Sequence, residues 1–426
     1  MTEPYTIAFA GFGYMGLRLL EGFLEYRKEV QGSFQITGFR LVRESTTKKV
    51  RAIYPDMIKA DTYEDLFAGR TVSDVVIASP TEQHIPQATF AIEQGAGVFL
   101  EKPISTDLRE AETFVDFVLD HNSIVFIDYI EDALPISQLR DALLFGELHE
   151  AVRLIPRSFI ALRTKDRENP DIEKNWRDFD HIAGRDSIHC LFKILKILSK
   201  TSDDEPVLLP RSVKAVSKEL IHPDPAFPKR ISGQIVGELA FDGDIRVQIL
   251  TSALSEHRRG FTVPACLDLS QAEQEEAKVQ HISCVDPDGK PAVLLLNFIR
   301  NTFDVWGVDT DVIEAYLKRR GFHPRTSEVE IEGKPFRRYV FGDTNIDTWV
   351  MRTYFGLKAL KTHRSVRDIN RDIALCTVTA GYYTQLWAEL LQQSVDRGGR
   401  ILHAAYVRRR NVYGLREFRP DISGDR

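Results

Sequence analysis

The sequence predicts an α/β protein, with a doubly wound parallel sheet followed by an α+β domain that holds a large, mostly antiparallel open sheet. Apolar runs rich in β-branched residues alternate with helical patterns up to residue 129. A glycine-rich turn follows the first of these runs directly. In the second half, glycine-containing turns separate segments of strand character, which favours hairpins.

Two domains fit the length of 426 residues, which is enough for two sizeable cores. The regular alternation breaks between Glu131 and Pro135. We therefore expect a dinucleotide-binding domain over residues 1–130 and a substrate-binding and oligomerisation domain over residues 131–426.

Composition argues against several classes of partner. The 56 basic and 62 acidic residues give a net charge of −6, so no nucleic-acid partner is expected. Four scattered cysteines show no metal-ligand spacing, which indicates a reducing compartment and no metal site. The first strand begins near Tyr5, and no apolar run approaches ~20 residues, so we expect a cytoplasmic protein without signal peptide or membrane span.

The first strand, residues 5–10, leads into a Gly-x-Gly-x-x-Gly turn, and helical spacing of apolar residues begins at Leu17. In this context the first glycine permits a tight turn, the second lets a pyrophosphate approach, and the third lets helix pack on strand. A purely structural turn is the alternative. The expected cofactor-binding residues of the turn are Gly11, Phe12, Gly13, Tyr14, Met15 and Gly16.

The next strand, residues 34–42, ends where an acid normally binds the ribose of NAD. Arg40 and Arg43 lie there instead, and arginines suit the 2′-phosphate of NADP. Glu44 could be the missing acid if the register shifts, and all three could be solvated loop residues. The sequence therefore favours NADP over NAD as the cofactor.

Two buried strands end in polar residues. Residues 72–78 lead to Ser79-Pro80 before a helix over 85–94, and residues 98–100 deliver Glu101 and Lys102. Ligands bind outside the carboxyl ends of strands in open α/β sheets. A lysine beside an acid at this place predicts chemistry, and a surface lysine is the alternative.

Further along, residues 108–121 form an amphipathic helix, which Asp107 and Glu110 are expected to cap, and residues 123–129 form another strand. A helix over 136–145 precedes a long strand over 151–164. Three hairpins follow, and their strand pairs are 232–241 with 245–253, 280–285 with 291–299, and 327–332 with 336–341. Residues 220–230 are expected to form a proline-rich loop. Helices are expected over 186–200, over 311–320, and twice near the C-terminus.

The Pro80-Thr81-x-x-His84 and Glu101-Lys102-Pro103 motifs, at this spacing, resemble the glucose–fructose oxidoreductase / inositol dehydrogenase / rhizopine-catabolism (GFO/IDH/MocA) family. The resemblance implies an N-terminal Rossmann domain and an NAD(P)-dependent oxidoreductase. It also implies a sugar, cyclitol or related polyhydroxylated substrate, whose proton Lys102 would handle. The cofactor-binding residues it adds are Ser79, Pro80, His84, Glu101 and Lys102.

Two segments, Trp176-Arg177 and residues 184–189, resemble a second site motif of the same family. It implies that Asp186 and His189 assist Lys102 in catalysis. Here they are three residues apart, whereas the family spacing is four. His189 also shares a helical face with Lys193, Lys196 and Lys200, so a solvated polar face is the alternative. The substrate-binding residues expected are Lys102, Tyr129, Trp176, Arg177 and His189.

Two other functions remain open from the sequence. Some relatives bind the dinucleotide as regulators or sensors without turnover, which the altered Asp186/His189 spacing would favour. Others are NAD-dependent glycosidases. The exposed sheet of the second domain suggests a homodimer or homotetramer.

Overall fold

The computed structural model describes residues 5–30, 34–39, 44–165, 187–201, 209–221, 230–252, 261–342 and 345–420. The chain forms two compact units. The first comprises Met1–Leu134, Thr344–Gln385 and Arg408–Val412, and the second comprises Pro135–Asp343, Leu386–Val407 and Tyr413–Arg426.

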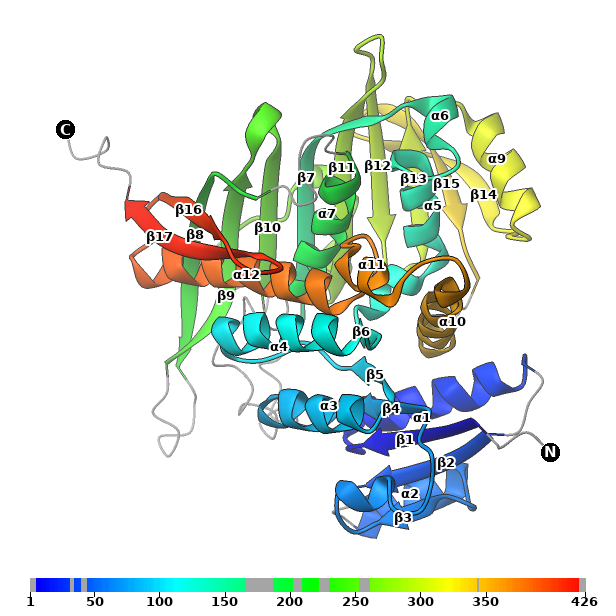
Figure 1. Cartoon of the computed structure of the whole chain (residues 1–426). Coiled ribbons are helices and arrows are strands. Elements are labelled where there is room, and N and C mark those ends of the chain that lie inside the picture. The colour runs from blue at the N-terminus through cyan, green and yellow to red at the C-terminus, as the bar shows by residue number, and fades with distance from the viewer. Residues whose placement is uncertain are drawn as a thin grey trace. The chain divides into compact units, whose positions relative to one another are not determined.

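A six-stranded sheet of order β3-β2-β1-β4-β5-β6 forms the centre of the first unit (Figure 1). All of its strand pairs are parallel. Its interior strands are apolar and inaccessible to water, because helices cover a parallel sheet on both faces. The strands are β1 (Tyr5–Ala10), β2 (Phe34–Phe39), β3 (Ile58–Ala60), β4 (Asp74–Ile77), β5 (Gly97–Leu100) and β6 (Val125–Ile127).

The helices of this unit come from two regions of the chain. The N-terminal ones are α1 (Tyr14–Arg27), α2 (Glu44–Ile53), α3 (His84–Glu93) and α4 (Leu108–His121), with short 3₁₀ turns at Glu64–Leu66, Thr81–Gln83 and Ile130–Ala133. The later ones are α10 (Ile346–Ala359), the turn Leu360–Thr362, α11 (Val366–Arg371) and the first residues of α12 (Val378–Asp396). Asp107 begins α4 by accepting hydrogen bonds from two backbone N–H groups, while Glu110 accepts one from Ser105.

Residues 344–385 join the first unit, which differs from the expected division at residue 130. A buried ion pair explains why. Asp74 lies on β4 with no exposed surface, and Lys358 of α10 contacts its two carboxyl oxygens at 2.5 and 2.6 Å. Tyr354 donates a further hydrogen bond of 2.6 Å to Asp74. A buried carboxylate needs such partners, so α10 supplies the charge that β4 requires.

An 11-stranded sheet forms the second unit, in the order β14-β15-β13-β12-β11-β7-β10-β9-β8-β16-β17. Only β7 and β10 pair in parallel among the described ladders. The predicted fold class is confirmed. The strands are β7 (Ile155–Thr164), β8 (Ser212–Ile221), β9 (Arg230–Ala240), β10 (Arg246–Ser252), β11 (Ala277–Val285), β12 (Pro291–Asn297), β13 (Thr302–Trp306), β14 (Arg325–Ile331), β15 (Lys334–Val340), β16 (Leu402–Arg408) and β17 (Tyr413–Pro420).

All three predicted hairpins are present, as β9–β10, β11–β12 and β14–β15. The last turns at Glu332-Gly333, whose φ angles are 49° and 73°, rather than at Gly333-Lys334-Pro335. Positive φ at both central residues gives the tight hairpin turn that matches strand twist. Residues 220, 221 and 230, expected in a loop, instead extend β8 and β9, and residues 222–229 lie outside the described residues.

Helices α5 (Pro135–Leu144) and α7 (Ile188–Thr201) lie on one face of this sheet (Figure 1). The long strand expected from residue 151 begins at Ile155, because His149–Val152 form a helical turn, α6, that ends at Arg153 in the left-handed region. The remaining helices are α8 (Gln271–Glu275) and α9 (Thr310–Arg319), with 3₁₀ turns at Asp242–Asp244 and Ala265–Leu267.

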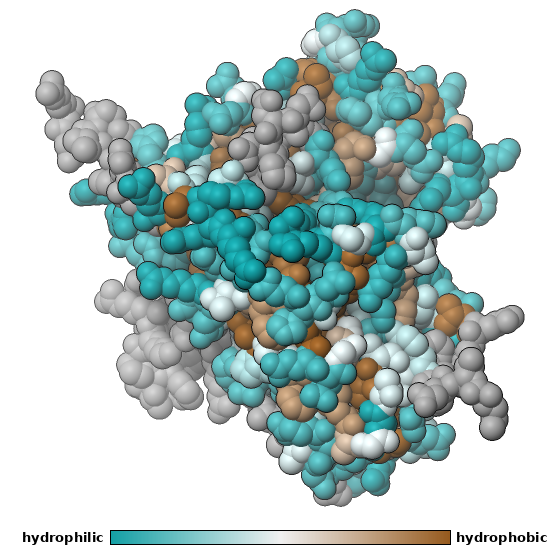
Figure 2. Space-filling view, in the orientation of Figure 1, coloured by the Kyte–Doolittle hydropathy of each residue, from teal (hydrophilic) through white to brown (hydrophobic). Residues whose placement is uncertain are grey.

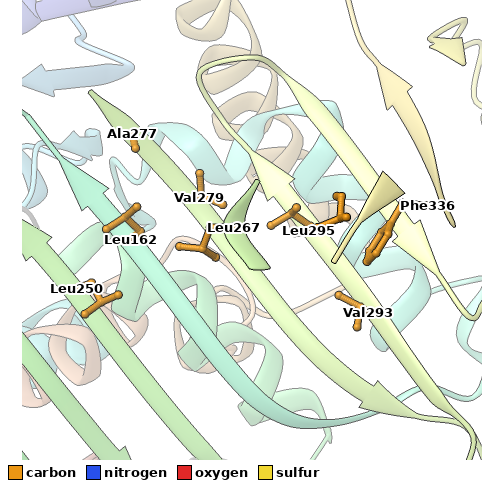
Figure 3. Packing of buried hydrophobic residues seen from close by; sticks show 9 residues of the cluster. Leu162, Leu250, Leu267, Ala277, Val279, Val293, Leu295 and Phe336 are labelled. Carbon is orange, nitrogen blue, oxygen red and sulfur yellow. The ribbon is translucent and has the colours of Figure 1, made fainter. Parts of the chain in front are cut away.

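A hydrophobic cluster holds the middle strands of the large sheet together. Figure 3 shows Leu162, Val279 and Leu295, from three neighbouring strands, with Leu267 lying over them. Leu267 is 1% exposed, so the turn that carries it closes the cluster. Burying a leucine of this kind stabilises a fold by about 1.5–3 kcal/mol.

The visible surface is mostly hydrophilic, with hydrophobic residues alone or in small groups (Figure 2). Within the described part of the chain, no helix is long and apolar enough to cross a membrane.

Candidate functional site

The parallel sheet reverses its strand order between β1 and β4, because β2 and β3 follow on one side and β5 and β6 on the other. Such a reversal leaves a crevice at the carboxyl ends of the strands. The polar segments that follow β1, β4, β5 and β6 therefore meet at this edge.

At two of the three glycines after β1, neighbouring backbone atoms lie too close to leave room for a side chain. Gly11 has φ of +92°, and a Cβ there would lie 2.7 Å from the Ala78 carbonyl oxygen. A Cβ on Gly16 would lie 2.1 Å from the Gly11 carbonyl oxygen. Gly13 is different, because a Cβ on it would have no atom within 4 Å. Gly13 also precedes α1 directly, where unpaired N–H groups favour anions, so this open space fits a pyrophosphate.

The other side chains of this turn point in different directions. Phe12 is 4% exposed and stacks on Phe9 in the core, so only its backbone can face a ligand. Tyr14 is 76% exposed, and the Arg18 guanidinium lies over its ring. Met15 is half-buried.

His84 is buried and connects two loops of this edge. Its Nδ1 lies 2.7 Å from the Pro103 carbonyl oxygen, and its Nε2 lies 3.0 Å from the Ser79 carbonyl oxygen. Burial lowers the pKa of His84, although both carbonyl contacts act in the opposite direction. The ring thus fixes the loops after β4 and β5 to each other, while Pro80 is exposed and the Ser79 hydroxyl donates to Gln87.

Glu101 and Lys102 follow β5, and the next peptide bond, Lys102–Pro103, is cis. Lys102 is half-buried, whereas Glu101 is 9% exposed. Asp128 follows the neighbouring strand β6 and is 1% exposed. The Glu101 and Asp128 side chains are within hydrogen-bonding reach of each other. This edge therefore holds a buried pair of acids beside a lysine.

Arg18 of α1 and Asp347, near the start of α10, add a second pair of charges. Arg18 Nε and Nη2 lie 3.0 and 2.8 Å from the two Asp347 carboxyl oxygens. Arg18, Asp128 and Asp347 were not predicted as site residues. Asp128 could have been predicted, because it directly follows strand β6 just as Glu101 directly follows β5. No local sequence pattern points to Arg18 or Asp347.

Tyr129 is 3% exposed, and its hydroxyl is hydrogen-bonded to Thr384 of α12. Burial raises the pKa of this phenol. The Tyr129 hydroxyl is therefore already hydrogen-bonded within the first unit.

His189 lies in the second unit, near the start of α7, and is 6% exposed. Lys193 is 3% exposed, with its ammonium 3.7 Å from the Phe298 ring centre, and Lys196 pairs with Asp141 at 2.6 Å. His189 and Lys193 are therefore buried, so the alternative of a solvated polar face is wrong for them. Among the lysines of this face, only Lys200 at the end of the helix is exposed. Arg40, Arg43, Trp176, Arg177 and Asp186 lie outside the described residues.

Across the described ranges, no group of three His, Cys, Asp or Glu side chains is placed to hold a metal ion.

Residues 5–129 match the GFO/IDH/MocA family, described as an oxidoreductase family with an NAD-binding Rossmann fold. A curated relative, Oxidoreductase P35 of Formosa agariphila, is 28% identical over 134 residues. That match covers 30% of this chain and 39% of the relative. Both matches fall on a minor part of the chain.

Solved structures extend the likeness over nearly the whole chain. Levoglucosan dehydrogenase, in complex with NADH and levoglucosan, is 14% identical with a TM-score of 0.64, covering 97% of this chain and 99% of that one. An inositol dehydrogenase homolog from Azotobacter vinelandii, complexed with NADH and myo-inositol, is 17% identical with a TM-score of 0.62, covering 95% and 98%. UDP-N-acetylglucosamine 3-dehydrogenase from Acidithiobacillus ferrooxidans is 16% identical with a TM-score of 0.61, covering 93% and 99%. At these identities the likeness establishes a shared fold.

Proposed function

We propose that this chain, whose residues 5–129 belong to the GFO/IDH/MocA oxidoreductase family, is an NAD(P)-dependent dehydrogenase or reductase acting on CH–OH groups. The substrate is a sugar, a cyclitol or a related polyhydroxylated molecule. The observation that carries the proposal is the half-buried Lys102, at the end of β5, on the sheet edge that also holds the open turn at Gly13.

The residues of this edge fit a dinucleotide. The turn of residues 11–16 and the first N–H groups of α1 would hold its pyrophosphate, and Ser79, Pro80, Glu101 and Lys102 would face its nicotinamide half. His84 would act indirectly, by holding the loops of Ser79 and Pro103 together. When bound, the nicotinamide supplies the hydride acceptor or donor.

Lys102 takes the hydroxyl proton during oxidation and returns it during reduction. His189, with Asp186 before it, is proposed as the second proton-handling group, and Trp176 and Arg177 as substrate contacts. His189 is 6% exposed, and this burial supports the role by keeping the ring away from bulk water.

A screen of sugars and cyclitols, followed through the absorbance of the reduced nicotinamide, tests the proposal. Turnover with one of them supports a dehydrogenase. Tight cofactor binding without any turnover would instead identify a regulator, and glycoside cleavage without net cofactor change would identify a glycosidase. Light scattering would show whether the protein is the expected homodimer or homotetramer.

Gly13→Ala is expected to weaken dinucleotide binding roughly tenfold or more while leaving the fold intact. The added methyl group meets no protein atom within 4 Å, but it occupies the space that a pyrophosphate needs. Gly356→Ala on α10 is the matched control, because its Cβ also has no neighbour within 4 Å. Cofactor titration and thermal unfolding measure both effects; equal affinity in the two variants would contradict this use of the turn.

NADP is expected to bind more tightly than NAD, because Arg40 and Arg43 can contact the 2′-phosphate. Removing either arginine should cost ~1–3 kcal/mol of NADP binding and leave NAD binding nearly unchanged. Calorimetric titration of both cofactors measures this difference. Equal affinities in the parent protein would point to Glu44 as a ribose ligand.

A further inference from the structure

Two buried acids at the carboxyl edge of the parallel sheet, Glu101 and Asp128, have no proton-handling role in the function proposed above. Asp128 is 1% exposed and Glu101 is 9% exposed. Among the described residues, none donates a hydrogen bond to Glu101 Oε1 or to either carboxyl oxygen of Asp128. Three buried acceptors without a donor are costly, and two ionised carboxylates in contact would also repel each other.

A single proton between the two side chains removes both costs. It supplies a donor for the contact between the carboxyl groups and leaves the pair with one negative charge instead of two. Burial raises the pKa of Glu101 and, with the neighbouring Glu101 charge, raises the pKa of Asp128 well above its usual range. Both directions agree with a retained proton.

The surrounding charges also balance with one proton. The groups that face the pair are Lys102 beside it, Arg18 from α1 and Asp347 at the start of α10. Three carboxyl groups carrying one proton hold two negative charges, which match the two cations. Without the proton, this largely buried cluster would carry an uncompensated negative charge.

We propose that Glu101 and Asp128 hold one proton between them, and that the single negative charge left on the pair positions Lys102 and sets the pH at which its amine becomes available. Asp128 is thus a positioning residue. The inference deepens the role proposed above for Lys102 and rests on that function for its meaning in catalysis.

The first test counts protons on unfolding. Above about pH 5 the unfolded chain has both carboxylates ionised, so unfolding releases the shared proton and stability falls as pH rises. Asp128→Asn mimics the protonated acid and removes that proton. The relevant pH range lies between pH 5 and the raised pKa of the acid pair. In this range each pH unit should increase the unfolding equilibrium constant of the parent protein by about tenfold more than that of Asp128→Asn. Parallel profiles would overturn the shared proton.

The second test reads Lys102 directly and needs no substrate. Competitive labelling with acetic anhydride, quantified by peptide mass spectrometry against Lys59, reports the midpoint at which each amine becomes reactive. Asp128→Asn keeps one negative charge on Glu101, so its Lys102 midpoint should move little. The double variant Glu101→Gln/Asp128→Asn removes the charge, and its midpoint should fall by about one pH unit or more.

If Glu101→Gln and Asp128→Asn each lowered the Lys102 midpoint by the same amount, the two carboxylates would carry independent charges, and the shared proton would be overturned. An unchanged midpoint in the double variant would overturn the positioning role. Circular dichroism checks that each variant is folded, and Glu101→Gln with Asp128 intact provides a second single variant. Cofactor binding by the parent protein is measured in a separate titration. Failure of the proposed function is therefore distinguishable from failure of the shared-proton hypothesis.

Discussion

Lys102→Ala is expected to slow turnover by about 10²–10⁴-fold, which is what loss of a positioned acid–base group costs. Lys102 follows β5 and is half-buried, so its removal creates no cavity in the core. The midpoint of thermal unfolding should therefore stay close to that of the parent protein. Steady-state kinetics on the substrate found by the screen, together with a thermal melt, measure both quantities.

Two further variants sharpen this result. Lys102→Arg keeps a positive charge but cannot release a proton near neutral pH, so it should be nearly as slow as Lys102→Ala. Lys59→Ala removes a half-exposed lysine of β3 in the same sheet and should retain parental turnover. If folded Lys102→Ala turned over at the parental rate, Lys102 would not be the proton-handling group.

Lys358→Met is expected to reduce the free energy of unfolding by about 3–5 kcal/mol at neutral pH. Asp74 is fully buried, and Lys358 lies 2.5 and 2.6 Å from its carboxyl oxygens, so the substitution leaves a buried carboxylate without its cation. Urea unfolding measures the loss. Lys361→Met, on the exposed turn after α10, makes the same chemical change and should cost much less.

The same variant has a predictable pH dependence. Burial already raises the pKa of Asp74 in the parent protein, and loss of Lys358 raises it further. A carboxyl with a raised pKa in the folded state costs stability as pH increases above the unfolded value near 4. The difference between Lys358→Met and the parent should therefore shrink as the pH is lowered toward 4. The double variant Asp74→Asn/Lys358→Met should be more stable than Lys358→Met alone; if it is not, the ion pair is not the reason for the loss.

Local signals predicted most of the fold. Asp107 and the apolar spacing after it predicted the helix over 108–121, and α4 has those same bounds. Asp242-Gly243 and Pro287-Asp288-Gly289 predicted hairpins that the large sheet contains. The return of residues 344–385 to the first unit was missed, because the pairing of Asp74 with Lys358 spans 284 positions and leaves no local pattern.

The site was predicted less completely. Glycine spacing and strand ends correctly predicted the backbone positions of Gly11, Gly16 and Lys102, whose binding and catalytic roles stay predictions. Side-chain direction was not predictable: Phe12 and Tyr129 proved to be buried. The roles of Asp186, Trp176, Arg177 and His189 stay predictions.

Because α10 supplies the charge partner of Asp74, the first unit is still incomplete when its first 134 residues have been synthesised. At about 5–20 residues per second, roughly ten seconds to a minute of translation separate Leu134 from Gln385. Strands β7 to β15 of the large sheet are synthesised in that interval, and β16 and β17 follow Gln385. Each unit is therefore completed only by segments that follow residue 343. Expressed alone, residues 1–134 would carry a buried aspartate without its lysine, and a fragment meant to bind dinucleotide must include residues 344–385.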